Sequence, residues 1–195
     1  MEEIRETKDE IRSSIAKTLA ELSESVVEKN TKRIEKRLFE FANFLEANIA
    51  LLYVNSISEV NSFKIIKRCL SYNKIVILPA FDITTYEMKL MKIDTVDEDL
   101  IIGPRGILEP DSSRCNVVPI ECIDIAIIPG VAFDEKGARI GSGDGYYDRI
   151  IPKLPITTRK VALAFGCQII PQIQMESHDK HVDIIITEKR IIYKI

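Results

Sequence analysis

Residues 129–149 read PGVAFDEKGARIGSGDGYYDR, and this stretch decides how the rest of the chain is interpreted. Five of the protein's eight glycines fall within it, and three of them alternate at Gly141, Gly143 and Gly145. Because ordering a glycine costs more backbone entropy than ordering any other residue, this clustering indicates a specific requirement of the backbone. An apolar, strand-like run precedes the stretch at residues 123–128, and a helix-like segment follows at 146–151.

A glycine-rich connection from a strand to a helix predicts an anion-binding loop, since the N–H groups at a helix start attract negative charge. Arg139 supplies a cation suited to phosphate, and Asp148 supplies an oxygen ligand suited to magnesium. A mobile surface turn is the alternative, because GxGxG alone matches neither the dinucleotide fingerprint nor the phosphate-loop motif. The aromatic and charged residues in the same block favour the anion-binding loop.

The block resembles the signature of the 5-formyltetrahydrofolate cyclo-ligase family, also called methenyltetrahydrofolate synthetases. The family pattern, PG-hydrophobic-x-F-D-x-x-G-x-R-hydrophobic-G-x-G-x-G-Y-Y-D, fits residues 129–148 without a gap. The resemblance extends loosely over most of the chain. It implies ATP binding by two segments, whose residues are Lys8, Asp9, Glu10, Ile11 and Arg12, and Arg139, Ile140, Gly141, Ser142, Gly143, Asp144, Gly145, Tyr146 and Tyr147.

Lys8 and Arg12 are four residues apart, so a helix places them on one face. Spacing alone favours a solvated charged face. The resemblance reverses this interpretation, because it places a K-x-x-x-R pair near the N-terminus against the nucleotide phosphates. It therefore implies that Arg139, Lys8 and Arg12 act in catalysis.

The resemblance also implies a folate site and a metal site. Val54, Glu59, Ser142 and Tyr146 would bind the folate substrate. Magnesium would be held by Asp148 and Asp179, the latter in a segment, HDKHVD at 178–183, that a capped loop also explains. Two carboxylates together with nucleotide oxygens suit this cation. Glu109 lies in a family-like G-I-x-E-P element and is expected near the pocket, without an assigned role.

The function that the resemblance implies is the ATP- and magnesium-dependent conversion of 5-formyltetrahydrofolate to 5,10-methenyltetrahydrofolate, with release of ADP and phosphate. Two alternatives stay open at this point. The first is a catalytically weak relative that binds nucleotide or folate, and the second is a different ATP-dependent enzyme on the same scaffold.

Composition narrows the class of protein. The chain has 195 residues, 46% hydrophobic and 29% charged, which is typical of a globular domain. A net charge of −3 and a pI near 5.6 argue against a nucleic-acid partner, and the sequence shows no membrane span or signal peptide. The four cysteines have no CxxC spacing, which favours reduced thiols and a cytoplasmic protein. We expect a monomer, with an oligomer as the alternative.

The periodicity of apolar residues predicts strands alternating with helices. This order favours an α/β, three-layer sandwich with a central, largely parallel mixed sheet flanked by helices. We expect one domain over residues 1–195, with N-terminal helices at about 3–46 packed on an α/β core at about 48–195. The first helix has apolar positions from Ile4 to Leu22, and the second has Ile34, Leu38, Phe41 and Leu45 on one face. Strands are expected at 49–54, 74–78, 87–93, 124–128, 160–165, 182–187 and 190–195, a helix at 63–70, and a loop-rich segment at 94–117.

Ligands of such folds bind beyond the carboxyl ends of the parallel strands. Four segments follow predicted strands and carry polar side chains: 55–59, 79–82, 129–148 and 187–188. The strand pattern therefore predicts that these segments build the site.

Overall fold

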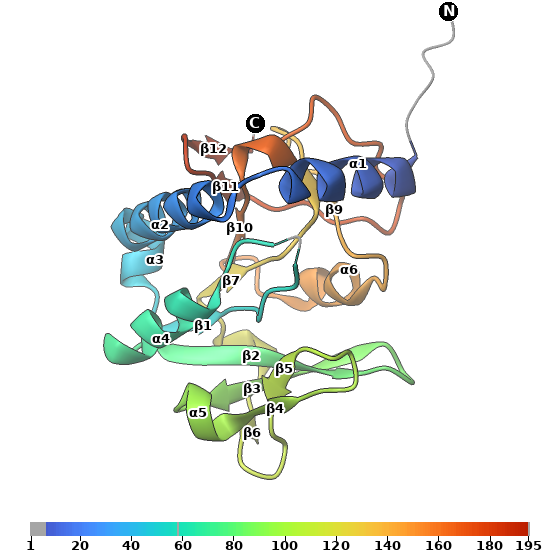
Figure 1. Cartoon of the computed structure of the whole chain (residues 1–195). Helices are drawn as coiled ribbons and strands as arrows, with labels where there is room; N and C mark the ends of the chain where they lie inside the picture. Colours follow the sequence, from blue (N-terminus) through green and yellow to red (C-terminus); the bar gives the residue numbers. More distant parts are fainter. Residues whose placement is uncertain (1–6, 58, 195) are drawn as a thin grey trace, which may run out of the picture.

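The computed structural model describes residues 7–57 and 59–194, and within them an eight-stranded sheet forms the centre of the protein (Figure 1). The strand order is β12-β11-β10-β7-β1-β2-β3-β6. The strands of this sheet are β1 (Ile49–Leu51), β2 (Ile75–Asp82), β3 (Glu87–Ile93), β6 (Asn116–Val117), β7 (Ile125–Ile127), β10 (Arg159–Leu163), β11 (Ile184–Ile186) and β12 (Ile191–Tyr193).

Two small hairpins and several helices complete the described fold. The hairpins pair β4 (Leu100–Ile102) with β5 (Leu108–Pro110) and β8 (Ala132–Phe133) with β9 (Arg139–Ile140). The helices are α1 (Lys8–Ala20), α2 (Glu24–Glu40), α3 (Ala42–Glu46), α4 (Phe63–Ser71), α5 (Val96–Asp99) and α6 (Tyr146–Ile150), with short 3₁₀ turns η1 (Ile120–Cys122), η2 (Ile151–Lys153) and η3 (Gly166–Gln168).

The middle of the sheet is parallel and its edges are antiparallel. β11, β10, β7, β1 and β2 pair in parallel, while β12 at one edge and β3 and β6 at the other run antiparallel to their neighbours. The predicted largely parallel mixed sheet is therefore confirmed. So are the antiparallel strand at 87–93 and the edge strand in the tail, of which Ile195 lies outside the described residues.

Successive strand residues face opposite layers, as the pleat requires. On β7, Ile125 and Ile127 belong to a core cluster that includes Ile34 of α2 and Ile66 of α4. Ala126, between them, belongs to a second cluster that contains Tyr146, Tyr147 and Ile150 of α6. Helices thus cover both faces of the sheet, and the three-layer arrangement is confirmed.

α1 lies against the β8–β9 hairpin instead of the sheet. Its buried Ile11 and Ile15 form a separate cluster with Val131 and Ile140. A capping box between Thr7 and Glu10 fixes its start. This packing holds the first helix beside the glycine-rich segment, 129–149. Residues 3–6 of the predicted N-terminal helices, including Ile4, lie outside the described residues.

The predicted second helix is wrong beyond residue 40, because it breaks into α2 and α3. Phe41 adopts an extended conformation, with φ −79° and ψ 119°. Leu45, expected on the apolar face, has 56% of its surface exposed. The break turns Phe44 into the core, where its side chain is fully buried, so packing overrides the regular apolar spacing.

β2 does not end at Pro79 as predicted but continues to Asp82. Pro79 pairs with Leu90 of β3 on one side, while β1 ends at Leu51, opposite Ile77. Proline has no N–H, so a strand tolerates it where no neighbouring strand would accept a hydrogen bond at that position. Pro79 occupies such a position, since the pairing of β1 with β2 ends at Ile77, two residues before it.

The predicted strand at 49–54 is shorter, and the predicted loop at 94–117 is more ordered. Pairing of the first strand stops at Leu51, so Tyr53 and Val54 are free to line a pocket. The loop-rich segment contains α5, β4, β5 and β6. Glycine and proline there mark the turns of a hairpin that crosses the carboxyl end of β2.

Candidate active site

A pocket of about 330 Å³ opens at the carboxyl ends of β1, β2 and β7. Its lining side chains include charged and apolar groups, which we call the charged wall and the apolar wall. The charged wall comprises Lys8, Arg12, Arg139, Asp148, Glu176, His178 and Asp179. The apolar wall comprises Tyr53, Val54, Pro79, Phe81, Ile107, Leu108, Tyr146 and Tyr147. Gly141, Ser142, Gly143 and Gly145 of the glycine-rich segment also line the pocket.

The centre of the charged wall is a buried ion pair within the glycine-rich segment. Arg139 on β9 donates from Nη2 to Oδ1 of Asp148 on α6 at 2.7 Å, and from Nη1 to the carbonyl of Pro129 at 3.2 Å. Only 3% of the Arg139 side chain is exposed. Its Nε is buried without an acceptor among the described residues. Buried donors are normally paired, so this one is available to a ligand or to water.

The loop between Arg139 and Asp148 leaves its backbone donors free. Among the described residues, none accepts a hydrogen bond from the N–H groups of Ser142, Gly143, Asp144 or Gly145. Gly143 has a φ of +123°, which strongly favours glycine. A Cβ on Gly141 would lie 2.6 Å from Nη1 of Arg139, so the loop can pass the guanidinium closely only without a side chain. These features suit a loop that binds an anion.

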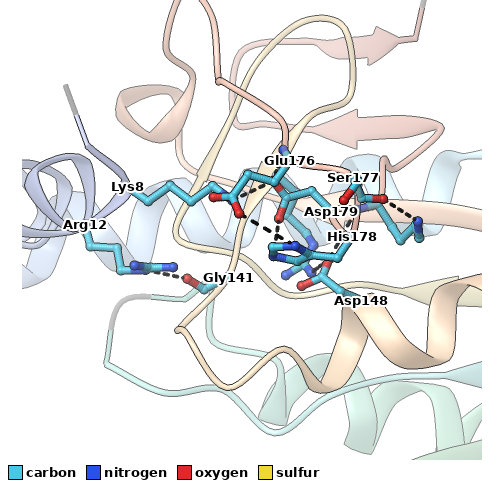
Figure 2. A network of polar contacts seen from close by, with 10 residues as sticks. Lys8, Arg12, Gly141, Asp148, Glu176, Ser177, His178 and Asp179 are labelled. Atoms are coloured by element: carbon cyan, nitrogen blue, oxygen red, sulfur yellow. Dashed lines mark hydrogen bonds and ion pairs between the residues drawn. The ribbon is translucent and has the colours of Figure 1, made fainter. Parts of the chain in front are cut away.

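α1 contributes two cations from the far end of the chain, as Figure 2 shows. Lys8 contacts Oδ2 of Asp179 at 2.6 Å and Oε1 of Glu176 at 3.0 Å. Arg12 donates from Nε to the carbonyl of Gly141 at 2.8 Å. The helix therefore connects the glycine loop with the segment around Asp179, and both predicted cations line the pocket.

Four residues predicted at the ATP site do not line this pocket. Asp9 is exposed and pairs with Arg12, Glu10 caps α1 through Thr7, and Ile11 is buried against the β8–β9 hairpin. Asp144 turns to Arg105, with 3.0 Å between its Oδ2 and Nη2 of the guanidinium. A helix presents only every third or fourth residue to one neighbour, which explains why Lys8 and Arg12 reach the pocket and the residues between them do not.

The two predicted magnesium ligands both line the pocket, each beside a cation. Asp148 Oδ1 accepts from Arg139 and from the Lys180 N–H, whereas Asp179 Oδ2 accepts from Lys8 and from the Glu176 N–H. Burial alone would raise the pKa of Asp179. The hydrogen bonds from Glu176 and Lys8 outweigh it and lower the pKa below its ordinary value.

The carboxylates near this wall fit a hard cation. Oδ2 of Asp148 has no hydrogen-bonding partner among the described residues, and Oδ1 of Asp179 faces only His178, at 3.5 Å. Oxygen donors of this kind suit magnesium. The tightest cluster of ligand atoms, however, joins Asp179 with Glu176 and His178, within 4.8 Å of one another, and does not include Asp148.

The residues predicted to bind the folate all lie at the pocket. Val54, Glu59, Ser142 and Tyr146 all line it. Burial raises the pKa of Glu59 above its ordinary value. The hydrogen bond from the Ser56 N–H, at 2.7 Å, and the positive charges of Arg105 and Arg139 lower this pKa, but burial outweighs them. The Tyr147 hydroxyl is buried without a partner among the described residues. Burial raises the pKa of this hydroxyl well above its ordinary value, so it stays protonated and can donate to a ligand.

Three of the four segments predicted after strands reach the pocket, and the fourth does not. Thr187 and Glu188, which follow β11, lie elsewhere: Glu188 accepts from the Gly166 N–H and Thr187 closes the turn to β12. β11 lies beyond β10 from the pocket in the strand order, so its end is too far along the sheet.

Sequence reasoning missed Arg105, Phe81 as a wall residue and Glu176. Arg105 lies at the tip of the β4–β5 hairpin, and its signal was a lone arginine in the turn GPRG. Glu109, for which no role was assigned, is buried behind the pocket and accepts from the Phe81 N–H at 2.9 Å. Asp183 is structural, because it binds both the N–H and the ammonium of Lys160.

Comparisons with known proteins identify the family of the chain. A family model described as "5-formyltetrahydrofolate cyclo-ligase family" matches residues 4–188. The chain is 29% identical over 201 residues to "Probable 5-formyltetrahydrofolate cyclo-ligase" of Schizosaccharomyces pombe, covering 96% of this chain and 98% of the other. It is 25% identical over 194 residues to the "5-formyltetrahydrofolate cyclo-ligase" of Mus musculus, covering 95% of each.

A solved structure shares the fold over nearly the whole chain. The NMR structure of Aquifex aeolicus 5,10-methenyltetrahydrofolate synthetase superposes with a TM-score of 0.83 at 28% sequence identity. The match covers 95% of this chain and 92% of that one. In the part of the chain that the structure describes, every helix is too short or too polar to cross a bilayer.

Proposed function

Since the chain belongs to the 5-formyltetrahydrofolate cyclo-ligase family, we propose that it converts 5-formyltetrahydrofolate to 5,10-methenyltetrahydrofolate while ATP becomes ADP and phosphate. The observation that carries this proposal is the pocket itself. The glycine loop with its free N–H groups, the Arg139–Asp148 pair and two cations from α1 meet one apolar wall. Phosphates suit the charged side of this pocket, and a flat heterocycle suits the other side.

The reaction needs no protein nucleophile, because the substrate supplies both attacking atoms. The formyl oxygen attacks the γ-phosphorus and ADP leaves. N10 then bonds to the activated formyl carbon, phosphate departs with the former formyl oxygen, and N10 loses its proton. The protein positions the two substrates and stabilises the charge on the transferring phosphoryl group.

We assign the phosphates to the free N–H groups of the glycine loop, to Lys8, Arg12 and to Arg139. Arg139 is pre-oriented by Asp148 and Pro129, so little reorganisation accompanies binding. Lys8 and Arg12 reach the same region from α1.

Asp148 and Asp179 are the residues we propose to hold magnesium, with Glu176 as a neighbour of Asp179. The bound cation would neutralise charge on the phosphate oxygens. The separation of Asp148 from the tightest acidic cluster favours a site completed by the nucleotide and water, as is usual for magnesium.

We further propose a cytoplasmic monomer. The four cysteines are free thiols, which suits a reducing compartment. Sedimentation of the purified protein tests the monomeric state.

The decisive experiment follows the ultraviolet absorbance of 5,10-methenyltetrahydrofolate. Purified protein is mixed with 5-formyltetrahydrofolate, ATP and magnesium, and each component is omitted in turn. We expect a signal that requires all three. The R139A variant, prepared in parallel, excludes a contaminating activity if its signal is lost.

Absence of turnover in folded protein with intact substrates would contradict the proposal. Calorimetric titration with ATP and with 5-formyltetrahydrofolate then separates the alternatives. Binding without turnover identifies a catalytically weak relative, and ATP binding without folate binding identifies another ATP-dependent enzyme.

A further inference from the structure

Arg105 occupies a fixed position over the pocket. It lies in the turn of the β4–β5 hairpin, in which the Gly103 N–H donates to the Ile107 carbonyl at 2.8 Å. The base of the hairpin is attached to β2, because the Phe81 N–H donates to the buried carboxylate of Glu109 at 2.9 Å. The turn that carries Arg105 is therefore held above the end of β2.

The guanidinium of Arg105 packs on the apolar wall. It lies 4.4 Å from the ring centre of Phe81 and 5.1 Å from that of Tyr146. These two rings contact each other edge to face, with centroids 4.8 Å apart. Stacking on aromatic faces holds the planar group while its N–H donors stay available at the edge.

The one protein anion that contacts Arg105 among the described residues is easy to replace. Asp144 meets it at 3.0 Å, and the Asp144 side chain is 46% exposed. An ion pair that reaches water in this way contributes little and exchanges readily. Arg105 itself is 23% exposed, at the rim of the pocket, so a ligand carboxylate can take the place of Asp144.

The distribution of charge in the pocket indicates what Arg105 binds. Lys8, Arg12 and Arg139 belong to the charged wall, to which we assign the phosphates. Arg105 packs on Phe81 and Tyr146 of the apolar wall, whereas Arg139, which lies 6.0 Å from the ring centre of Tyr147, is already bound by Asp148. A reduced folate is a neutral pterin and benzoyl group that ends in a glutamate, so its carboxylates are the anions that would emerge from such a wall.

We propose that Arg105 binds a carboxylate of the glutamate portion of the folate substrate and so determines specificity for folates over pterins that lack it. This inference rests on the proposed function. It assigns Arg105 to substrate recognition, with Phe81 and Tyr146 holding its guanidinium in place.

The test compares two substrates and two proteins. Wild type and R105A are assayed with 5-formyltetrahydrofolate and with 5-formyltetrahydropteroate, which lacks the glutamate. Loss of a charge-assisted hydrogen bond corresponds to about 10- to 100-fold in affinity, so we expect the KM of wild type to rise by that factor on the truncated substrate. R105A should show the raised KM already with the full substrate and little further increase with the truncated one.

Two controls sharpen the result. R159A removes an exposed arginine at the start of β10, at the opposite end of the sheet, and should leave both KM values unchanged. R105K should recover part of the affinity, since the charge remains but the paired N–H donors are lost. The KM for ATP should stay within about twofold in all variants, because phosphate contacts are assigned to the charged wall.

An increase in the KM for ATP with no change for the folate would overturn the inference and assign Arg105 to phosphate. An equal increase for both folate substrates would overturn it as well, because the effect would not depend on the glutamate. Calorimetric binding of the same two ligands to wild type and R105A needs no turnover. It therefore decides the Arg105 contact even where the turnover assay fails, so the two proposals fail separately.

Discussion

The two ion pairs of the charged wall are built in opposite ways. Arg139 and Asp148 are nine residues apart, and their side chains are 3% and 17% exposed. Lys8 and Asp179 are 171 residues apart, with side chains 22% and 7% exposed. The first pair is part of one continuous motif, whereas the second forms only when α1 docks on the β8–β9 hairpin.

One pocket thus combines a local ion pair with a long-range one. The local pair is buried, so breaking it leaves an uncompensated charge and costs stability as well as activity. In the long-range pair the cation reaches water, with Lys8 22% exposed against 3% for Arg139, so removing Lys8 should cost less stability than removing Arg139.

Arg139→Ala should cause the largest loss. Removing a preorganised donor from a phosphoryl-transfer site costs about 10²- to 10³-fold in kcat. Leaving Asp148 beside an empty cavity should also lower the free energy of unfolding by about 3 kcal/mol. Steady-state kinetics and urea unfolding measure the two effects, with R159A as the matched surface arginine.

Asp148→Asn separates these two effects, because the isosteric amide keeps the shape of the pair without the negative charge. We expect a similar loss of kcat with a smaller loss of stability. If both R139A and D148N kept near-wild-type rates while folded, the pair would have no part in the mechanism.

Lys8→Ala should lower kcat/KM by about 10- to 100-fold, the value of a hydrogen bond to a charged group. Its effect on the free energy of unfolding should stay below about 1 kcal/mol, since Lys8 is partly exposed and Asp179 keeps the hydrogen bond from the Glu176 N–H. K17A, an exposed lysine on the same helix, is the control. A K8A protein as unstable as R139A would erase the contrast between the two pairs.

Gly141→Ala should disturb the local pair without removing any charge. The new Cβ would lie 2.6 Å from Nη1 of Arg139, so the guanidinium must shift. Overpacking of this kind costs about 1 kcal/mol of stability, and the shift should reduce kcat several-fold. G143A is the comparison: its Cβ meets open space, so strain at a φ of +123° should dominate its effect. Equal kcat values for the two variants would argue against Arg139 as the target of G141A.

The smallest effect concerns the pH dependence of the long-range pair. Asp179 has a pKa below its ordinary value of 3.8 in the folded protein. A group with a lowered folded pKa stabilises the protein above its unfolded pKa, and this contribution is lost as the pH falls through the folded pKa. We therefore expect D179N to lose less stability than wild type as the pH falls below about 4.

Lys8 gives the matching behaviour at high pH. Burial alone would lower its pKa, but hydrogen bonds to Asp179 and Glu176 raise it above 10.5. Its stabilising contribution should be present at neutral pH and be lost as the pH rises through the folded pKa. Urea unfolding of wild type and K8A above pH 10 measures it. Identical curves would show that the ammonium contributes nothing to folding.

Much of the fold could be predicted because apolar periodicity is a local property. The buried strands at 125–127, 159–163 and 184–186 and the antiparallel strand at 87–93 follow directly from their side chains. The break at Phe41 could not, because it depends on burying Phe44 in a core cluster with residues far along the chain, such as Ile125 and Ile184. The end of β2 was predicted wrongly at Pro79 for a similar reason, because a strand can continue through a proline only where the neighbouring strand has ended.

The pocket residues likewise include a set that local sequence spacing places together and a set that long-range packing brings in. Residues 129–148 carry within one segment the glycine loop, the buried arginine and the acid, so their proximity could be predicted from the sequence. Short-range spacing decides such a motif, since Arg139 and Asp148 need only one turn and the start of a helix to meet.

The other side chains that line the pocket depend on how distant elements pack against one another. From their spacing alone, Lys8 and Arg12 could equally lie on a solvated helix face. The packing of α1 on the β8–β9 hairpin brings these two side chains to the pocket, whereas Asp9 and Glu10 do not line it. Arg105 and Glu176 reach the pocket from loops whose course no periodicity encodes. A side chain's partners across the chain depend on how whole elements pack, and that packing minimises exposed apolar area over the entire molecule, which no local pattern records.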